Sequence, residues 1–344
     1  MKWRIVAGFL VGIAAITIFV ILVGWQDVIS AINRTDPSIY ALAFGLTLVA
    51  LGLRALVWIN MLDILDHDIG RPTVAGIFLS AKFFKYISPY GQVSATPGIA
   101  WFVGAFTDVD YERNLAAIVS ADLFTYSPYY TFGALALGFT LLSAAPFPRV
   151  ELYVGAAAII VLVLIVALWT VLFKRNITER LVISVLSPLR WILDRLGVSY
   201  GEEFTTSAIR DRIDGFYTTI DSLRDDQSTM LAGFIFGHAA WLFLMLPLMV
   251  VAWAVGVNLP IYLAMLVIAL SKLGFVVPLP GGISGVEFAI AGLLILIAGV
   301  GQTDAVAMAI LYRFATFYFT LGIGGIAASI IIIRWPGGRS FLRR

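Results

Sequence analysis

Long apolar blocks recur along this chain, and they constrain its fold more than any other feature of the sequence. A helix needs about 20 predominantly apolar residues to cross a bilayer. Apolar residues make up 60% of the chain and charged residues 13%, whereas a soluble domain carries about 25% charged residues. The sequence therefore predicts an all-α membrane protein with six long transmembrane helices. The six blocks fall at about residues 5–24, 37–62, 114–145, 150–173, 229–256 and 304–333.

The first block follows two basic residues, Lys2 and Arg4, as the apolar part of a secretory signal also would. A signal peptide, however, has a shorter apolar run and a small-residue cleavage site. This block has the length of a full span and leads into Trp25 and Asp27. We therefore expect it to be retained as the first span.

Four shorter apolar blocks come in two pairs, and proline and glycine interrupt each pair. The interruptions are Ser88-Pro-Tyr-Gly91 and Pro278-Leu-Pro-Gly-Gly282. Backbone polar groups do not face lipid unsatisfied, so the breaks either lie inside protein, as tips of re-entrant hairpins, or form ordinary turns at the surface. The paired blocks cover residues 72–87 and 92–107, then 260–277 and 283–300.

Basic side chains mark one side of the membrane. If the N-terminus is cytoplasmic, the loops near residues 63–71, 108–113 and 174–228 share that side with the basic C-terminal tail. The opposite loops hold Arg34 and Arg149. Because basic loops favour the cytoplasm, we expect a multi-pass protein of the cytoplasmic membrane with both termini cytoplasmic.

The chain is expected to divide into two membrane halves and a connector. Residues 1–173 form the N-terminal half with a broken hairpin at 72–107, and residues 229–344 form the C-terminal half with a broken hairpin at 260–300. The connector, residues 174–228, lacks a spanning run. Apolar residues recur there at helical spacing between charged ones, which predicts an amphipathic cytoplasmic helix. They are Ile209, Ile213, Phe216, Ile220 and Leu223.

The two halves share an order of features at a constant offset of 190 residues. In both, a lysine, a broken segment, a serine and a long span with a buried charge follow one another, although identities are few. The first hairpin starts on the cytoplasmic side and the second on the opposite side, so the pattern predicts an inverted repeat, as in many secondary transporters. The aligned pairs are Lys82 with Lys272, Gly91 with Gly281, and Ser94 with Ser284.

Helix-start signals follow both breaks. Thr96-Pro97 is typical of an N-cap with proline at the first helical position, and Ser284 with Glu287 matches a capping box. A helix N-terminus presents free N–H groups and the positive end of the helix dipole, which suit a phosphate. We expect both helix starts to face a shared cavity.

Charged residues occur within the apolar segments, where a charge near the bilayer centre costs several kcal/mol and is usually paired or functional. Asp122 and Arg313 each lie roughly 12–14 Å from the start of a span, close to the midplane. We expect both to face the interior, where they pair or bind substrate. The other embedded charges are Arg54, Lys82, Lys272 and Glu287.

Several of these residues also fit a simpler role. Arg54 could snorkel to the cytoplasmic interface. Lys82 and Lys85 could reach the cytoplasmic surface if their segment is shallow, and Glu287 could serve only the capping box. Lys272 is harder to place at a surface, because a long apolar stretch precedes it.

Motifs for catalysis and metal binding are lacking in the sequence. There is no cysteine, and the two histidines, His67 and His238, are far apart. The GxSxG, P-loop and HExxH motifs are absent. We therefore expect no metal, no cofactor and no enzymatic activity.

Two stretches of the C-terminal half resemble a known family. Residues 278–287 read PLPGGISGVE and residues 307–316 read AMAILYRFAT. Both are similar to the C-terminal signature of the lysylphosphatidylglycerol synthase transmembrane family, also called the flippase-like family, and Leu53-Arg54 with Trp58 resembles its N-terminal signature. The resemblance implies a flippase domain for aminoacylated phospholipids or polyprenyl-linked glycans, and archaeal relatives are associated with dolichol phosphate sugars.

Two departures from the family narrow what the resemblance implies. Family members that transfer aminoacyl groups carry a soluble C-terminal domain, whereas this chain is expected to end shortly after its last span. Lysyl transfer is therefore not expected. The first break, Ser88–Gln92, also lacks the Pro/Gly-rich run that is more usual in the family.

Together these features predict a transporter that moves an anionic lipid, either a phospholipid or a polyprenyl- or dolichyl-phosphate-linked sugar, across the cytoplasmic membrane. Two other functions stay open: a membrane scaffold that partners a glycosyltransferase, and an intramembrane enzyme acting on a lipid phosphate. We expect the headgroup to be bound by Lys82, Gly91, Ser94, Asp122, Lys272, Gly281, Gly282, Ser284, Glu287 and Arg313, with Arg54 and Lys85 as additional members.

Overall fold

The computed structural model describes residues 2–65, 68–88, 95–107, 109–142, 174–177, 179–180, 184, 206–277 and 279–334. All regular structure within these residues is helical, so the predicted all-α fold is confirmed. The span predicted at 150–173 lies outside the described residues. So do most of the connector before residue 206 and the first break, including Gly91 and Ser94.

The long helices follow the predicted blocks closely. They are α1 (Lys2–Asn33), α2 (Pro37–Asp63), α6 (Tyr111–Leu142), α10 (Gln227–Val255) and α13 (Gln302–Arg313), which continues through a π-helical turn, η4 (Phe314–Tyr318), into α14 (Phe319–Arg334). The shorter elements are α3 (Arg71–Ile87), α5 (Thr96–Thr107), α9 (Thr206–Asp225), α11 (Ile261–Leu270), the 3-10 turns η2 (Ser271–Val276) and η3 (Pro280–Gly282), and α12 (Gly285–Ala298).

Capping side chains fix where the long helices begin. The Asp36 carboxylate accepts hydrogen bonds from the N–H groups of Ser38 and Ile39 at the start of α2. Asp226 does the same for Ser228 and Thr229 at the start of α10. Such N-caps satisfy donors that have no partner within the helix. The sequence thus starts each of these spans with a local signal.

Five segments are long and apolar enough to cross a membrane: Val6–Asn33, Pro37–Asp63, Gln227–Val255, Pro280–Ala298 and Gln302–Arg334. Four of them match predicted long blocks, whereas Pro280–Ala298 was expected to be a short arm. The helix α6 is not among them although it has 32 residues. Its Asp122, Pro128 and several tyrosines lower its hydropathy, and the same residues build the centre of the molecule.

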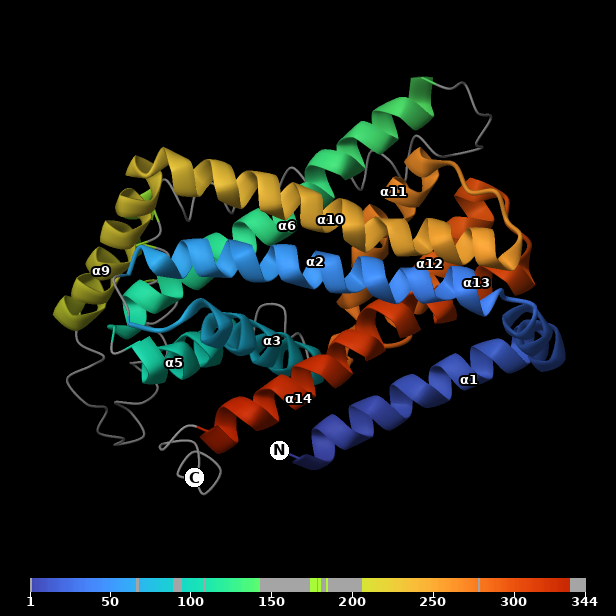
Figure 1. Ribbon diagram of the computed structural model, residues 1–344, viewed down its shortest axis with the longest axis horizontal. Helices are drawn as coiled ribbons and strands as arrows, with labels where there is room; N and C mark the ends of the chain where they lie inside the picture. The colour runs from blue at the N-terminus through green and yellow to red at the C-terminus, as the bar shows by residue number, and fades with distance from the viewer. Residues whose placement is uncertain are drawn as a thin grey trace.

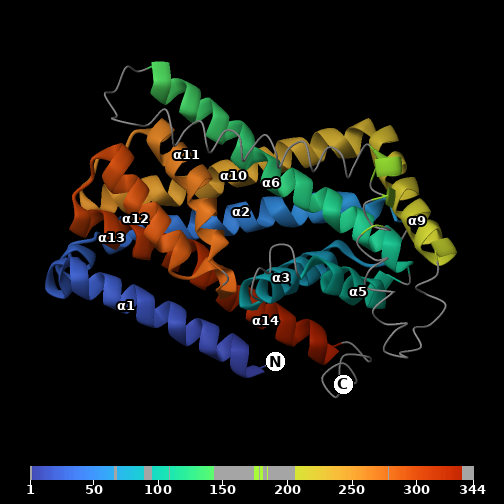
Figure 2. The same cartoon turned by 180° about the vertical axis from the view of Figure 1, so that it is seen from behind.

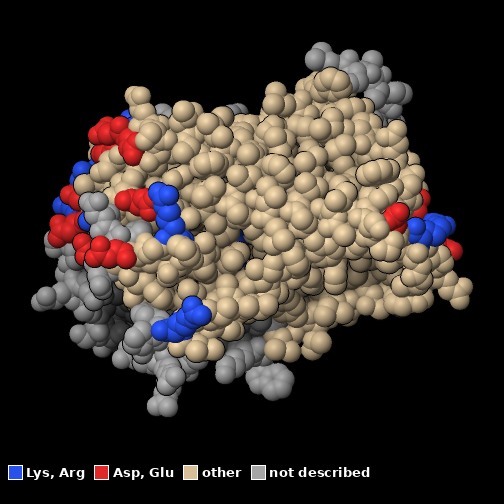
Figure 3. Space-filling view, viewed as in Figure 1, with Lys and Arg blue, Asp and Glu red and all other residues tan. Residues whose placement is uncertain are grey.

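The long helices α2 and α10 define an axis, and charged side chains lie at both ends of it. Helices α2 and α10 run side by side along the long axis (Figure 1), and α6 crosses them obliquely when seen from behind (Figure 2). Acidic and basic side chains gather at the two ends, with an uncharged belt between them (Figure 3). Arg34 pairs with Asp304 at the end where α2 begins, and Arg71 pairs with Asp63 where α2 ends. The axis therefore corresponds to the direction across the bilayer.

The two broken hairpins enter from opposite ends and meet. The helix α3 begins beside the Asp63–Arg71 pair, whereas α12 leads back to Asp304 at the other end. The tip of the second hairpin, η3, packs against α3, and all three of its residues are buried. A Cβ on Gly281 would lie 3.2 Å from the backbone carbonyl of Tyr86 near the end of α3. The alternative that the second break forms an ordinary turn at the surface is therefore wrong.

Equivalent elements of the two halves keep the predicted spacing. Each element of the second half begins close to 190 residues after its counterpart in the first half. The starting residues are Arg71 and Ile261 for the first arms, Thr96 and Gly285 for the second arms, and Tyr111 and Gln302 for the long helices that follow. This spacing supports the predicted repeat.

The helix α1 touches the second hairpin through two glycines. A Cβ on Gly8 would lie 2.8 Å from Cδ of Pro280, and one on Gly12 would lie 2.6 Å from Cγ2 of Ile283. Spaced four residues apart, both glycines lie on one face of the helix and allow close backbone approach, as in small-residue contacts between membrane helices. Further along, α1 packs against α13, where Val20, Val28 and Ala31 are buried.

Candidate functional site

Charged side chains from both halves gather where the second hairpin meets α3. Arg54, Lys82, Lys85, Glu287 and Arg313 are each at most 6% exposed. Snorkelling of Arg54 and exposure of the two α3 lysines at the cytoplasmic surface are therefore wrong, because all three point into the packed interior. The side chain of Asp122 is 14% exposed, and Lys272 is half-buried.

The first half contains a buried ion pair between Lys85 of α3 and Asp122 of α6. The Thr96 hydroxyl also donates to Asp122 Oδ2, at 3.5 Å. This triad joins both arms of the first hairpin to α6. Thr96 is already helical, and the N–H of Ile99 bonds the carbonyl of Ala95. The prediction of Thr96 as N-cap is wrong by one residue, and its hydroxyl faces a carboxylate instead of the helix start.

The second half contains the matching pair with its charges exchanged. Arg313 Nε of α13 donates to Glu287 Oε1 of α12 at 2.8 Å, and Arg313 Nη2 donates to the Gly281 carbonyl at 2.9 Å. The guanidinium also lies 4.0 Å from the ring centroid of Phe317. In the second half the hairpin supplies the anion, Glu287, and the long helix supplies the cation, Arg313. In the first half the hairpin supplies the cation, Lys85, and the long helix supplies the anion, Asp122.

The predicted capping box at Ser284 and Glu287 is wrong. Ser284 has φ +70°, and its hydroxyl donates to the Gly12 carbonyl of α1 at 2.7 Å. It makes no hydrogen bond to the start of α12. Glu287 turns to Arg313, because a buried guanidinium without an anion is costly. The serine thus joins the hairpin tip to α1, and the glutamate joins it to α13.

Gly281 can present its carbonyl to Arg313 because it adopts φ +60°. A Cβ at this position would lie 2.2 Å from the Phe317 ring. Any other residue would both strain the backbone and collide with that ring. The π-helical turn η4 starts directly after Arg313, and such turns are frequent at functional sites.

Three more cations lie in the cluster without a carboxylate partner among the described residues: Arg54, Lys82 and Lys272. Lys82 Nζ lies 5.4 Å from the ring centroid of Phe78 and 5.6 Å from that of Tyr126. Aromatic faces stabilise a desolvated ammonium only partly. No carboxylate in the described part of the chain forms an ion pair with Lys82.

Lys272 and Arg54 meet at Tyr129. Lys272 Nζ lies 4.6 Å from the Tyr129 ring centroid, and Arg54 Nη2 donates to the Tyr129 hydroxyl at 3.3 Å. Lys82 and Lys272, the lysines that the repeat aligns, therefore contact Tyr126 and Tyr129, which are three residues apart on α6. Two lysines from opposite hairpins converge on one face of one helix.

The described cluster has five cations and two carboxylates. Several buried polar atoms have no hydrogen-bond partner among the described residues, namely Arg54 Nε, Asp122 Oδ1, Thr125 Oγ1 and Glu287 Oε2. An excess of positive charge in a poorly solvated interior favours a bound anion.

The tyrosines of α6 are the part of the cluster that the sequence reasoning missed, since tyrosines in spans usually pack or anchor at interfaces. A signal was present in their spacing. Asp122, Tyr126 and Tyr129 lie four and then three residues apart, which places them on one helical face with a buried charge. Gly282 and Ser284 lie at the tip, but Ser284 points to α1 and not to the cluster.

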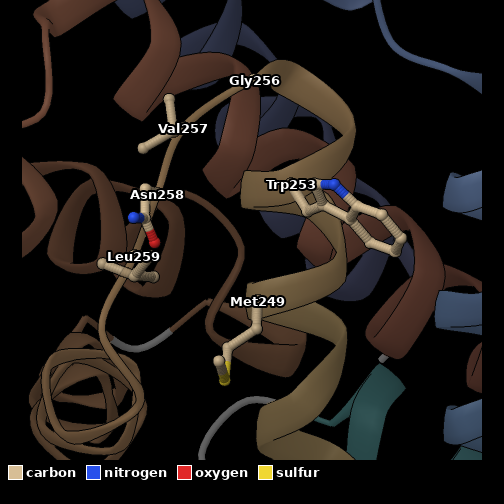
Figure 4. Close-up of a pocket in the computed structure, with 6 residues that line it drawn as sticks. All are labelled: Met249, Trp253, Gly256, Val257, Asn258 and Leu259. Carbon is tan, nitrogen blue, oxygen red and sulfur yellow. The ribbon is translucent and has the colours of Figure 1, made fainter.

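A separate hollow at the far end of α10 has a volume of about 270 Å³ (Figure 4). None of the predicted site residues lines it. The one amide side chain among its lining residues is that of Asn258. It therefore has no chemistry comparable with the cluster. Its lining residues are Met249, Trp253, Gly256, Val257, Asn258 and Leu259.

Comparison with known proteins places this architecture in a family. Residues 5–324 match the family described as the lysylphosphatidylglycerol synthase TM region. The chain belongs to this family. The resemblance read from residues 278–287 and 307–316 is thereby confirmed, and a membrane-embedded protein with a lipid-related role is compatible with the family.

Two relatives from Methanothermobacter thermautotrophicus strain Delta H are both described as UPF0104 membrane proteins. One is 24% identical over 327 residues, which cover 91% of this chain and 90% of the relative. The other is 20% identical over 334 residues, which cover 94% of each chain. The similarity to this family thus extends over nearly the whole chain.

Proposed function

We propose that this protein moves an anionic lipid across the cytoplasmic membrane and binds the lipid headgroup at the buried cationic cluster. The observation that carries the proposal is the set of three cations, Arg54, Lys82 and Lys272, that lack carboxylate partners in the described structure. Intramembrane charges of this kind usually mark a substrate pathway. The lipid is a phospholipid or a polyprenyl- or dolichyl-phosphate-linked sugar.

The surface beside Lys272 suits a lipid more than a water-soluble anion. Leu273 and Val276 of η2 and the next residue, Val277, follow this lysine and are 46%, 74% and 41% exposed. A headgroup that reaches Lys272 from this side leaves its hydrocarbon chains against apolar side chains and lipid.

Each half holds its own hairpin by its own ion pair. Lys85–Asp122 fastens the first hairpin to α6, and Glu287–Arg313 fastens the second to α13. The two halves also pack against each other, α2 along α10 and α3 along α14, so alternating access of the kind seen in repeat transporters would have to rearrange these two interfaces. With no nucleotide motif in the sequence, we expect an ion gradient or the lipid gradient itself to drive transport.

Orientation is part of the same proposal. The end that carries Arg71 and α9 faces the cytoplasm under the positive-inside rule. Both termini are then cytoplasmic, and the Arg34–Asp304 end faces outward. Lys82 belongs to the hairpin that enters from the cytoplasm, and Lys272 to the one that enters from outside.

The proposal is tested in liposomes that contain the purified chain alone, with fluorescent anionic and zwitterionic lipids in the inner and outer leaflets. We expect accelerated movement of the anionic lipid only. The double variant Lys82→Met/Lys272→Met loses this activity, whereas the exposed control Arg71→Gln keeps it. Movement no faster than in protein-free liposomes would overturn the proposal.

The same preparation separates the two rival functions. A scaffold for a glycosyltransferase moves no lipid by itself and retains its partner when the buried lysines are replaced. An intramembrane enzyme forms a new lipid product, and Asp122→Asn or Glu287→Gln abolishes product formation. Both carboxylates already form ion pairs in the described structure, so an enzymatic role would require one of these pairs to open.

A further inference from the structure

The cations without carboxylate partners, Arg54, Lys82 and Lys272, indicate how much negative charge the lipid headgroup carries. We infer that the headgroup carries at least two negative charges on phosphate, as a phosphomonoester or a diphosphate does, and not the single charge of a phosphodiester. This inference rests on the proposed function, because it concerns the same cluster.

The first step is the balance of charge. Asp122 and Glu287 are each engaged by a cation of their own half. Arg54, Lys82 and Lys272 therefore contribute three formal positive charges that no described carboxylate offsets. One negative charge would leave two of these cations uncompensated in a poorly solvated interior, where unpaired charge is unfavourable. A phosphomonoester carries about 1.5 to 2 negative charges near neutral pH.

The second step is the placement of these cations. Lys82 contacts Tyr126, and Lys272 and Arg54 contact Tyr129. Three residues along a helix correspond to about 4.5 Å of rise. The positive charges are thus spread along the face of α6 and not focused on one point. A phosphomonoester or diphosphate offers three or more free oxygens that carry about two negative charges, whereas a phosphodiester offers two free oxygens that share one charge.

The third step is the supply of hydrogen-bond donors. Arg54 Nε is buried and has no hydrogen-bond partner among the described residues. Guanidinium groups match phosphate oxygens in geometry. The guanidinium of Arg54 therefore provides a donor in addition to the two ammonium groups, as a multiply charged phosphate requires.

The test measures binding to the purified full chain in detergent. The lipid probes are phosphatidic acid, geranylgeranyl diphosphate, phosphatidylglycerol and phosphatidylcholine, with inorganic pyrophosphate as the anion without a lipid chain. We expect phosphatidic acid and the lipid diphosphate to bind at least tenfold more tightly than phosphatidylglycerol. Phosphatidylcholine is expected to bind most weakly.

Variants connect this preference to the cluster. Lys82→Met and Lys272→Met each reduce the preference for the multiply charged lipids at least threefold, and Arg71→Gln leaves it unchanged. Lys272 is half-buried, so Lys272→Met remains informative if Lys82→Met fails to fold. Pyrophosphate binding that depends on the same lysines supports the inferred phosphate chemistry. If pyrophosphate also binds as tightly as geranylgeranyl diphosphate, the source is a free anion and not a lipid headgroup.

The outcomes separate this inference from the proposed function. Equal affinity for phosphatidylglycerol and phosphatidic acid overturns the inference, even if phosphatidylglycerol is transported. A selective affinity for the multiply charged lipids, together with no transport of any lipid, supports the inference and overturns the proposed function.

Discussion

Lys82 and Lys85 lie three residues apart on α3 and are both buried, yet among the described residues it is Lys85 that forms an ion pair, with Asp122. Removing one partner of a buried pair leaves the other charge uncompensated, which costs about 3–5 kcal/mol. We therefore expect Lys85→Met to lower the free energy of unfolding by about this amount. Lys82→Met removes a charge without a partner and should leave stability unchanged or raise it.

Thermal unfolding of both variants in the same detergent measures this difference. The double variant Lys85→Met/Asp122→Asn serves as the control, because it removes both charges and should recover most of the stability lost in Lys85→Met. Equal destabilisation by Lys82→Met and Lys85→Met would show that the two lysines have the same environment, and the assignment of Lys82 to an anion site would then be wrong.

The contacts of Arg313 give a second prediction. This side chain bonds both Glu287 and the Gly281 carbonyl, and a lysine at the same position cannot reproduce two directed contacts. We expect Glu287→Gln to cost about 3–5 kcal/mol, because it leaves a buried guanidinium without its anion. Arg313→Lys keeps the charge and should cost less, about 1–3 kcal/mol.

Transport measurements on the Arg313 variants distinguish a positioning role from headgroup binding. If Arg313 mainly holds the hairpin tip, Arg313→Lys slows transport of all lipids to the same extent and does not change lipid preference. A changed preference, with stability unaltered, would place Arg313 among the groups that contact the headgroup.

The sequence alone predicted much of this architecture. The length and hydropathy of the blocks located four of the five segments that can span, and the offset of 190 residues aligned Lys82 with Lys272 before any contact was known. These features depend on local composition and on order along the chain. Neither feature requires knowledge of which distant residues are in contact.

The partners of the charged residues could not be predicted in the same way. Ser284 and Glu287 have the spacing of a capping box, but the positive φ of Ser284 and the nearby Arg313 turn both side chains elsewhere. Tyr126 and Tyr129 resemble packing residues until two hairpins bring lysines onto their rings. Contacts between residues far apart in the sequence decide between such alternatives, and a local sequence pattern carries no information about those contacts.

Gly281 gives a third prediction, about the hairpin tip. Gly281→Ala places a Cβ 2.2 Å from the Phe317 ring at φ +60°, so we expect it to be destabilising by at least 1–2 kcal/mol from backbone strain alone. Gly292 on α12 has open space around its Cβ position, and Gly292→Ala is the matched control. In the double variant Gly281→Ala/Phe317→Leu the collision is relieved but the strain remains, so recovery is expected to be partial. Full stability of Gly281→Ala would contradict the backbone conformation described for the tip.

The contact between Gly12 and Ile283 gives a fourth prediction, about movement. A Cβ on Gly12 would lie 3.1 Å from Cβ of Ile283, and a disulfide needs about 3.5–4.5 Å between its Cβ atoms. A small shift would therefore allow Gly12→Cys/Ile283→Cys to form a disulfide. The chain has no cysteine of its own, so oxidation would join α1 to the hairpin tip and affect no other site.

If transport requires the hairpin tip to move past α1, the oxidised double variant should transport lipid at least tenfold more slowly than the reduced form. Adding a reductant should restore the rate in the same liposomes. Each single cysteine variant controls for the substitutions, because it cannot form the disulfide within one chain and should not respond to oxidation. An oxidised variant that transports at the reduced rate would show that α1 and the tip move together, which would place the moving boundary between this pair and the first hairpin at Tyr86 and Gly281.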